Sequence, residues 1–563
     1  MHKLDTNTLP NSREHLLRVT GVLLLAAIVL SLPIFYFGVP DGNDMPQHLR
    51  FIYAFYNSVH NGEIYPVWPG ETNLGFGDVG IRFYPPLAYY VVVLFRSLTE
   101  SWASAYAAAI CFWFFVGGIG VFFLAREWFS VKASLAAALL FMAMPYHANQ
   151  VYNAGLFAEF TGLAILPFCF LFVGRTINYG KVSDVAGLAA AYALLILAHL
   201  PLTIIGSIGL VIYAIAAIEK RGAGRSLIKL ASAVVLALTT SAFYWVRIVA
   251  ELSFVKHSSP EFRGGAYDFR QNFLASILYM PSSEYGETSL WYTDLLFAIT
   301  LMMIVPSIAI YLATKKSESK NLAPFLVLLA LAIVISTPLS LPLWENIEFL
   351  KMIQFPWRFL GLISLAGSVV IGGSYDQLAE VFQTKLRPLG LIAAGLLIAG
   401  VVFTGTQVIR PANHSPRVAF DENFERYGND ESYECWWPIW ANKNAFVDRE
   451  QVSSGQRFVQ ILKWTADDRR FVVGEGSSKT VRVATFYYPF WKADADGSNA
   501  RVEPGEDGTV LIDVPPGRST VRLYFEEPVH ETIARYLSLL VWALLAFTVI
   551  AVRVNAHRHS NLD

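Results

Sequence analysis

The sequence predicts an α-helical membrane protein with many spans and a small β-sandwich-like domain outside the membrane. Hydrophobic residues make up 54% of the 563 residues and charged residues only 15%, with a mean hydropathy of +0.43, whereas soluble domains have about 25% charged residues. The charges are unevenly distributed, because residues 409–530 contain 15 Lys or Arg and 19 Asp or Glu in 122 positions. This composition excludes a disordered chain, a coiled coil and an ordinary soluble enzyme. The net charge of −1 gives no support to nucleic-acid binding.

Twelve segments are candidates for spanning helices, which need about 20 mostly apolar residues. They lie near residues 16–37, 104–125, 131–147, 155–174, 184–200, 202–218, 228–248, 290–313, 322–340, 356–375, 388–408 and 533–553. We therefore expect a transmembrane domain at residues 1–408, an extracytoplasmic domain at residues 409–530, and a C-terminal anchor with a cytoplasmic tail at residues 531–563.

Positive charges set the expected orientation. Lys and Arg gather in every second loop, notably in residues 219–229, 314–321 and 384–387, and short loops rich in these residues remain in the cytoplasm. Both termini are expected on that side. The apolar stretch 85–98 is only about 14 residues long, which is too short to span, and a crossing there would invert every later loop. We therefore expect a juxtamembrane helix within a long first outer loop, residues 38–103.

The charged segment has the pattern of β-strands. Alternating or β-branched stretches separated by turn residues lie at residues 457–464, 480–491, 508–517 and 519–527. The tryptophans of this segment could contact carbohydrate. We expect them instead to pack in its core or to rest on the membrane, because large aromatic side chains are usually buried.

The first outer loop contains the strongest candidate site. Asp44 is a favourable N-cap and Pro46 suits a first helical turn, so we expect a helix at about residues 45–60. His48 follows Asp44 by four residues and shares its face, and Asp41 lies one short turn earlier. One interpretation is that Asp44 only caps the helix; the other is that it acts as a general base or helps to bind a metal.

Several short stretches resemble a known family. They are residues 44–49, 62–68, 83–90, 157–167, 354–360 and 486–497. They resemble bacterial multi-pass proteins described as related to 6-pyruvoyl-tetrahydropterin synthase, and the last two also resemble YfhO-type membrane proteins. Those proteins look like GT-C glycosyltransferases. The resemblance implies a GT-C-like fold in the bacterial inner membrane and an acidic residue in the first outer loop that acts on a polyprenyl-phosphate-linked sugar.

The resemblance also implies roles for individual residues. Asp44 best matches the catalytic acidic position, with Asp41 as the alternate. Glu159 resembles a second acidic position that orients an acceptor or a metal; a structural role for it stays equally open, although acids are costly within a membrane. A divalent cation held by Asp44, His48 and Glu159 is left open, and no cofactor is certain.

Cations and aromatic residues complete the expected binding site. Arg358 begins a predicted span and has a fork of donors that suits phosphate; the alternative is an arginine that only reaches toward lipid headgroups. Arg82 and Arg247 are further cations expected on the same side. Trp68 and Tyr84 either contact a sugar ring or belong to an interfacial aromatic belt.

These expectations favour a glycosyltransferase. It would move a sugar from a polyprenyl-phosphate donor to a glycan, lipid or protein acceptor outside the cytoplasm, with inversion at the anomeric carbon. The alternative is a transporter, a flippase or an assembly factor for lipid-linked saccharides. A transporter would be favoured by matched broken helices in two inverted halves, and we find no such pair in the sequence.

Overall fold

The computed structural model describes residues 12–219, 222–259, 262, 265–278, 290–314, 322–410 and 414–560. Part of the predicted positive loops, residues 220–221 and 315–321, lies outside the described residues. The chain forms two compact units, and each is described by itself. Unit 1 contains residues 1–43, 103–237 and 268–417, and unit 2 contains residues 44–102, 238–267 and 418–563.

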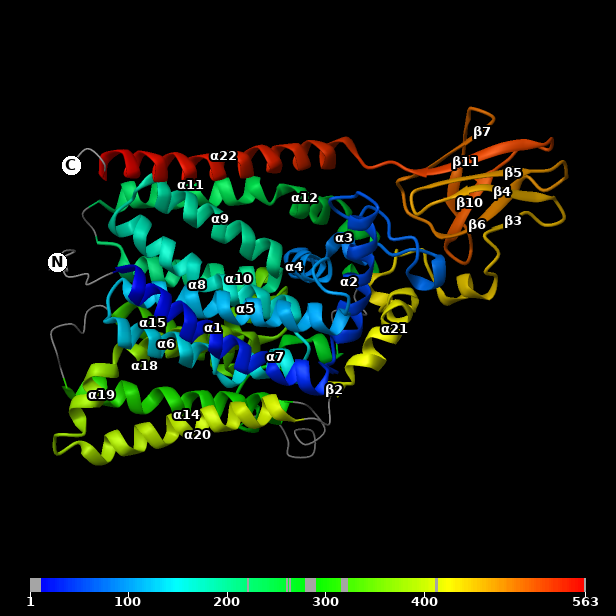
Figure 1. The fold of residues 1–563 in the computed structure, drawn as a ribbon. Helices are drawn as coiled ribbons and strands as arrows, with labels where there is room; N and C mark the ends of the chain where they lie inside the picture. Colours follow the sequence, from blue (N-terminus) through cyan, green and yellow to red (C-terminus); the bar gives the residue numbers. More distant parts are fainter. Residues whose placement is uncertain are drawn as a thin grey trace. The chain divides into compact units, whose positions relative to one another are not determined.

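Unit 1 is built of helices (Figure 1). In chain order they are α1 Ser12–Phe37, α5 Trp102–Arg126, α6 Val131–Met142, α7 Pro145–Tyr152, α8 Phe157–Asn178, α9 Val182–Ala198, α10 Leu200–Ala217, α11 Ala223–Thr240, α14 Leu290–Thr314, α15 Ala323–Ser336, α16 Leu341–Asn346, α17 Glu348–Lys351, α18 Leu360–Gly373, α19 Tyr375–Val381 and α20 Arg387–Ile409. Two short strands, β1 Val39–Pro40 and β2 His414–Ser415, pair antiparallel.

The centre of unit 1 is formed by the spans that contain α8 and α18, each with 89% of its apolar window buried. Small residues allow the close packing of α18. A Cβ atom on Gly372 would lie 2.5 Å from the Cβ of Ala137 on α6, and one on Gly361 would lie 2.7 Å from Leu163 on α8. Such small residues let helix backbones approach closely in membrane proteins.

The predicted class, a polytopic α-helical protein with a small sheet domain, is confirmed. Within the described residues, ten helices are long and apolar enough to span a membrane, or up to 11 if one bent pair is a single span. Two of the twelve predicted spans, residues 184–200 and 322–340, are not among these ten helices. The helix α9 has only 17 residues, and the helix α15 ends before a bend of 83° at the break that precedes Pro338.

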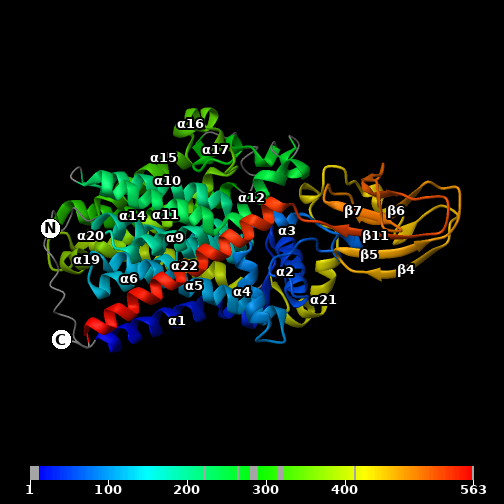
Figure 2. The same cartoon turned by 90° about the horizontal axis from the view of Figure 1, so that it is seen from above.

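Unit 2 combines helices with two sheets. Its helices are α2 Met45–His60, α3 Gly80–Phe83, α4 Leu87–Arg96, α12 Ala242–Glu251, α21 Arg417–Asn429 and α22 Val529–Ser560. The helix α12 packs against the long α22 (Figure 2). The stretch 85–98 contains α4, whose ten residues are about 15 Å long, half the roughly 30 Å of a bilayer core.

The strands of unit 2 form two antiparallel sheets in the orders β3-β6-β10-β9 and β4-β5-β11-β7-β8. Their bounds are β3 Val452–Ser453, β4 Val459–Trp464, β5 Asp468–Val473, β6 Thr480–Phe486, β7 Trp491–Ala495, β8 Ser498–Ala500, β9 Val502–Pro504, β10 Thr509–Asp513 and β11 Ser519–Phe525. Alternate side chains of both sheets share one core, as in a sandwich. The four predicted strand stretches contain β4, β6, β10 and β11, whereas β3, β5, β8, β9 and all of β7 after Trp491 were not predicted.

Residues of the first loop complete the core of the sandwich. Trp68 and Phe76 are each only 1% exposed and belong to the same hydrophobic cluster as the strands. The ring of Trp68 lies 5.2 Å from that of Trp491, and the backbone N–H of Phe486 donates to the carbonyl of Phe76 at 2.8 Å. The loop that follows α2 is therefore fixed to the sandwich.

Candidate functional site

Asp44 lies half-buried at the N-terminus of α2. An N-cap carboxylate normally accepts a hydrogen bond from the second or third backbone N–H of its helix, with its own backbone extended. The backbone of Asp44 is instead helical, with φ −88° and ψ −7°, and its side chain makes no capping bond to the described helix. The expected capping role is therefore not what holds this carboxylate in place.

Three polar side chains from distant segments lie within range of the Asp44 charge. Burial raises the pKa of Tyr267 and of Tyr433, and the negative charge of Asp44 adds to both shifts. Burial, followed by the carboxylates of Asp78 and Asp44, raises the pKa of Cys435 to about 12. All three groups stay protonated at neutral pH, so they can donate hydrogen bonds near the carboxylate.

His48 is buried one turn further along α2. Its Nδ1 lies 2.9 Å from the hydroxyl of Tyr89, and its ring packs edge-to-face on Tyr84 at 5.5 Å. Burial lowers the pKa of His48 to about 3, so the imidazole is neutral. Tyr84 in turn contacts Trp436, with ring centroids 5.6 Å apart. The substrate-binding roles predicted for His48 and Tyr84 stay predictions.

Two polar residues of α2 that are not among the predicted site residues, Gln47 and Arg50, lie against the segment that contains Tyr433. The Oε1 of Gln47 accepts a hydrogen bond from the backbone N–H of Tyr433 at 3.0 Å, and the Arg50 guanidinium lies 5.6 Å from the centre of the Tyr433 ring. Residues three apart are neighbours on a helix surface. The spacing of Asp44, Gln47 and Arg50 was therefore the signal that could have identified this polar face.

In unit 1, the structure brings together two other predicted site residues, Glu159 and Arg358. Glu159 is 1% exposed and accepts hydrogen bonds from the Tyr146 hydroxyl at 2.5 Å and from Gln150 Nε2 at 3.1 Å. Arg358 Nε lies 3.0 Å from Glu159 Oε2, as an ion pair rather than an aligned hydrogen bond. Arg358 also donates to the carbonyl of Ile353 at 2.9 Å. Near the start of α8, Glu159 and Arg358 thus neutralise each other's charge, and hydrogen bonds fix both side chains.

Arg82 and Arg247 belong to a buried cluster of ion pairs in unit 2. Arg82 is fully buried and contacts both oxygens of Glu251, at 2.8 and 3.1 Å. It also lies 3.2 Å from Glu531. Arg247 Nε lies 2.7 Å from Glu531, and its Nη2 pairs with Glu527. The two arginines predicted to bind phosphate are therefore held by carboxylates of the same unit.

The remaining predicted residues are in different environments. Asp41 is an exposed residue of unit 1. Trp68 lies inside the sandwich core, so a substrate contact would require its ring to leave that core. Trp437 and Trp491 are 0% and 2% exposed, in agreement with the expected packing role. Among the described residues, no three His, Cys, Asp or Glu side chains are grouped so as to hold a metal ion.

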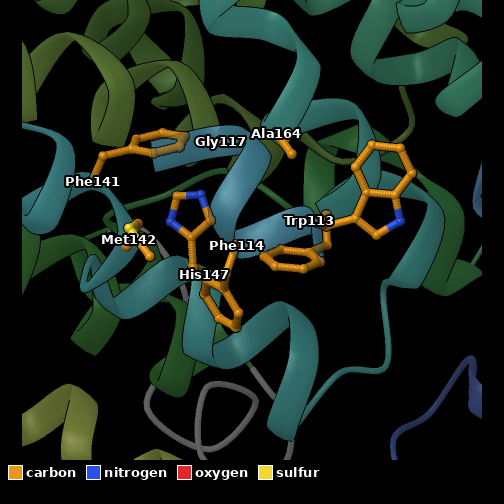
Figure 3. A pocket seen from close by; sticks show the side chains of 8 residues that line it. Trp113, Phe114, Gly117, Phe141, Met142, His147 and Ala164 are labelled. Carbon is orange, nitrogen blue, oxygen red and sulfur yellow. The ribbon is translucent and has the colours of Figure 1, made fainter. Parts of the chain in front are cut away.

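A small cavity lies within unit 1 beside His147 (Figure 3). Neither ring nitrogen of His147 has a hydrogen-bond partner in the described part of the chain. The cavity volume of about 10 Å³ is close to the minimum for one water molecule. The cavity is therefore too small for a sugar. It is lined by Trp113, Phe114, Gly117, Phe141, Met142, His147, Phe160 and Ala164.

Three solved structures of GT-C glycosyltransferases are similar to the chain. The arabinofuranosyltransferase AftD from Mycobacteria has 16% identity and a TM-score of 0.44, with 69% of this chain and 27% of that chain covered. ArnT from Cupriavidus metallidurans, bound to undecaprenyl phosphate, has 15% identity and a TM-score of 0.44, with 73% and 77% covered. The Archaeoglobus fulgidus oligosaccharyltransferase has 14% identity and a TM-score of 0.42, with 76% and 60% covered. Similarity at this level does not transfer a function.

Two comparisons of sequence are more direct. An uncharacterized protein of Lactococcus lactis subsp. cremoris is 25% identical over an alignment of 256 residues, and the match covers 43% of this chain. The match spans only 41% of the length of that relative. A family model for the 6-pyruvoyl-tetrahydropterin synthase related domain, a membrane protein domain, matches residues 81–406. Because the match covers more than half of the chain, the protein belongs to the family of 6-pyruvoyl-tetrahydropterin synthase related membrane proteins.

Proposed function

We propose that the protein is a glycosyltransferase of the bacterial cytoplasmic membrane that uses a polyprenyl-phosphate-linked sugar. The observation that carries the proposal is the position of Asp44. It follows the first apolar helix in the chain, its carboxylate is not used to cap α2, and its negative charge acts on the hydroxyl groups of Tyr267 and Tyr433. A half-buried carboxylate that is not committed to a helix cap can act as a general base.

In the proposed reaction, Asp44 takes the proton from an acceptor hydroxyl or amine. The acceptor atom then bonds to the anomeric carbon of the donor sugar. The bond between that carbon and the phosphate oxygen breaks, and polyprenyl phosphate leaves with the electron pair. A single displacement inverts the anomeric centre. No step requires an oxidant or a second substrate beyond donor and acceptor.

Arg358 is the candidate cation for the leaving phosphate. Its ion pair with Glu159 and its bond to the carbonyl of Ile353 fix the guanidinium, so binding would cost little side-chain entropy. Arg358→Lys keeps the charge but loses the planar fork. We expect weaker binding of undecaprenyl phosphate to this variant, measured on purified protein in lipid nanodiscs. Unchanged affinity would remove Arg358 from the site.

The test of the base compares Asp44→Asn with Asp41→Asn and with a matched control, Asp421→Asn, which changes a half-buried carboxylate on α21. General base catalysis contributes about 10²–10⁴-fold, so Asp44→Asn should lower sugar transfer from a labelled polyprenyl-phosphate donor to membrane extracts by that order. Donor binding should remain. Full transfer by folded Asp44→Asn, with loss in Asp41→Asn, would move the role to Asp41.

The alternative of a flippase makes a different prediction. A flippase would move a fluorescent lipid-linked sugar between leaflets of a proteoliposome without forming a glycosidic bond. Among the described residues, one helix pair is sharply bent, whereas transporters of inverted-repeat type use matched pairs. Lipid movement without transfer, unaffected by Asp44→Asn, would favour the flippase.

A further inference from the structure

We propose that Gln47, Arg50 and Asp78 form a subsite that binds the hydroxyl groups of a sugar ring beside Asp44. The inference rests on the proposed function and names the chemistry that the same site recognises. Its basis is a group of unused polar atoms. Within the described residues, Gln47 Nε2, Arg50 Nε and Nη1, and Asp78 Oδ2 are buried and have no hydrogen-bond partner.

The side chains of Gln47 and Asp78, which carry two of these atoms, are fixed by hydrogen bonds through their other polar atoms. Gln47 is 4% exposed and is fixed through its other amide atom, Oε1, which accepts from the backbone of Tyr433. Asp78 is 2% exposed, and its Oδ1 accepts from the Gly80 N–H at 2.6 Å. The Ser432 hydroxyl and the backbone of Val79 also act on this carboxylate, and Oδ2 keeps room to accept another hydrogen bond. Buried polar groups in proteins are nearly always hydrogen-bonded. Positioned side chains with free donors and a free acceptor therefore indicate that another molecule completes the bonding.

The set of unused atoms identifies the class of ligand. Gln47 and Arg50 offer donors, whereas the Asp78 carboxylate offers an acceptor. A phosphate has only acceptors and would leave Asp78 unmatched. Three carboxylates, those of Asp430, Asp78 and Glu431, also act on the Arg50 charge, and they would repel an anion. A sugar hydroxyl both donates and accepts, so neighbouring hydroxyls of one neutral ring match the whole set.

The spacing along α2 fits one sugar ring next to the proposed base. A helix rises 1.5 Å per residue, so Gln47 and Arg50 lie about 4.5 and 9 Å along the axis from Asp44. A monosaccharide fits within this length. The Arg50 guanidinium lies 5.6 Å from the centre of the Tyr433 ring, and the residue Tyr433 is 42% exposed. Rotation of this ring would uncover the donors of Arg50 and present an aromatic face to the sugar.

The ring could belong to the donor or to a saccharide acceptor, and the probes distinguish the two. We would measure binding to the full-length protein in nanodiscs with undecaprenyl phosphate, with undecaprenyl-phosphate-linked hexoses and pentoses, and with the corresponding methyl glycosides. The variants are Arg50→Lys, which loses the fork, and Asp78→Asn, which replaces the acceptor. The matched control is Arg96→Lys, because Arg96 also lies over two aromatic rings of unit 2, those of Tyr56 and Trp102.

We expect Arg50→Lys and Asp78→Asn each to weaken binding of sugar-bearing probes by about tenfold, as for lost hydrogen bonds to charged groups. Binding of undecaprenyl phosphate alone should stay within about twofold, and Arg96→Lys should bind like the wild type. A loss confined to the lipid-linked sugars assigns the subsite to the donor, and a loss confined to the methyl glycosides assigns it to the acceptor.

Two results would overturn the subsite while leaving the proposed function intact. Sugar binding that is unchanged in both folded variants would mean that the unused atoms bind only water. An equal loss of undecaprenyl phosphate binding in Arg50→Lys would mean that Arg50 contacts phosphate. If the wild-type protein binds no sugar-bearing probe, both the subsite and the glycosyltransferase proposal fail.

Discussion

Replacement of Arg82 by methionine should strongly destabilise the protein. Arg82 has no exposed surface and contacts one backbone carbonyl and two carboxylates of unit 2. Its guanidinium donates to the carbonyl of Val67 at 2.9 Å and to both oxygens of Glu251, and it pairs with Glu531. Glu251 also accepts from the Tyr488 hydroxyl at 2.6 Å. Arg82→Met would leave two buried carboxylates near one remaining arginine, Arg247.

The expected loss follows from this burial. Removal of one partner from a buried ion pair costs about 3–5 kcal/mol, because the other charge stays buried and uncompensated. For a unit of this size, 1 kcal/mol shifts Tm by about 2–4 °C, so Tm should fall on the order of 10 °C. Burial raises the pKa of Glu251, but the Arg82 charge outweighs it and lowers that pKa to about 2. Its stabilising contribution is therefore complete above its ordinary pKa of 4.5 and is lost as the pH falls toward 2.

A double-mutant cycle separates charge from packing. Glu251→Gln keeps an acceptor for the Tyr488 hydroxyl and removes the negative charge. The pair Arg82→Met with Glu251→Gln should lose less stability than the sum of the single variants, with a coupling of about 1–3 kcal/mol. Thermal unfolding of the purified protein, followed by circular dichroism at pH 7 and pH 4, measures both effects. A Tm change below 2 °C for Arg82→Met, or full additivity in the cycle, would refute the reasoning.

Three further results are expected. Asp44→Asn should keep Tm within about 2 °C of the wild type, because its side chain makes no capping bond to α2; a larger fall would show a structural role. Burial raises the pKa of Asp78 to about 6, so the folded state binds its proton more tightly and loses stability as the pH rises from about 4 to 6. The difference in Tm between Asp78→Asn and the wild type should therefore be more favourable to the variant at pH 7 than at pH 5. An equal difference at both pH values would contradict this. In a cysteine-free background, single cysteines at the exposed positions 71 and 499 should react with an impermeant maleimide on intact cells, and one at position 132 should not. Labelling at 132 would overturn the predicted orientation.

Most of the fold could be predicted because it depends on local patterns. Long apolar segments identify the helices of unit 1, and alternation identifies β4, β6, β10 and β11. The strand β5 was missed because it begins with Asp468, Arg469 and Arg470, which have the composition of a loop. Arg469 is nevertheless fully buried, with the rings of Trp464 and Trp491 at 4.5 and 5.2 Å from its guanidinium. Trp464 belongs to the neighbouring strand β4, whereas Trp491 belongs to β7, which β11 separates from β5 in the same sheet. No local pattern could predict this burial.

The site was harder to predict, because the partner of a charge can be far away in sequence. Arg82 looked like a phosphate ligand from its position in the first loop. Its carboxylate partners, Glu251 and Glu531, follow it by 169 and 449 residues. A single sequence gives no sign of such pairs. The polar face of α2 differs, because Asp44, Gln47 and Arg50 lie three residues apart on one helix. Their spacing could therefore have been recognised in the sequence.

The same long-range contacts change how the charged segment should be understood. Its composition suggested a separate soluble domain, but its core is incomplete without Trp68 and Phe76 of the first loop. Its residue Tyr433 accounts for the contacts of Gln47 and Arg50 on α2. A removable accessory domain would have closed its own core and left α2 untouched. In unit 2, the sandwich, the first loop and the helix that begins after Asp44 are instead one folded structure, so the segment helps to build the candidate site.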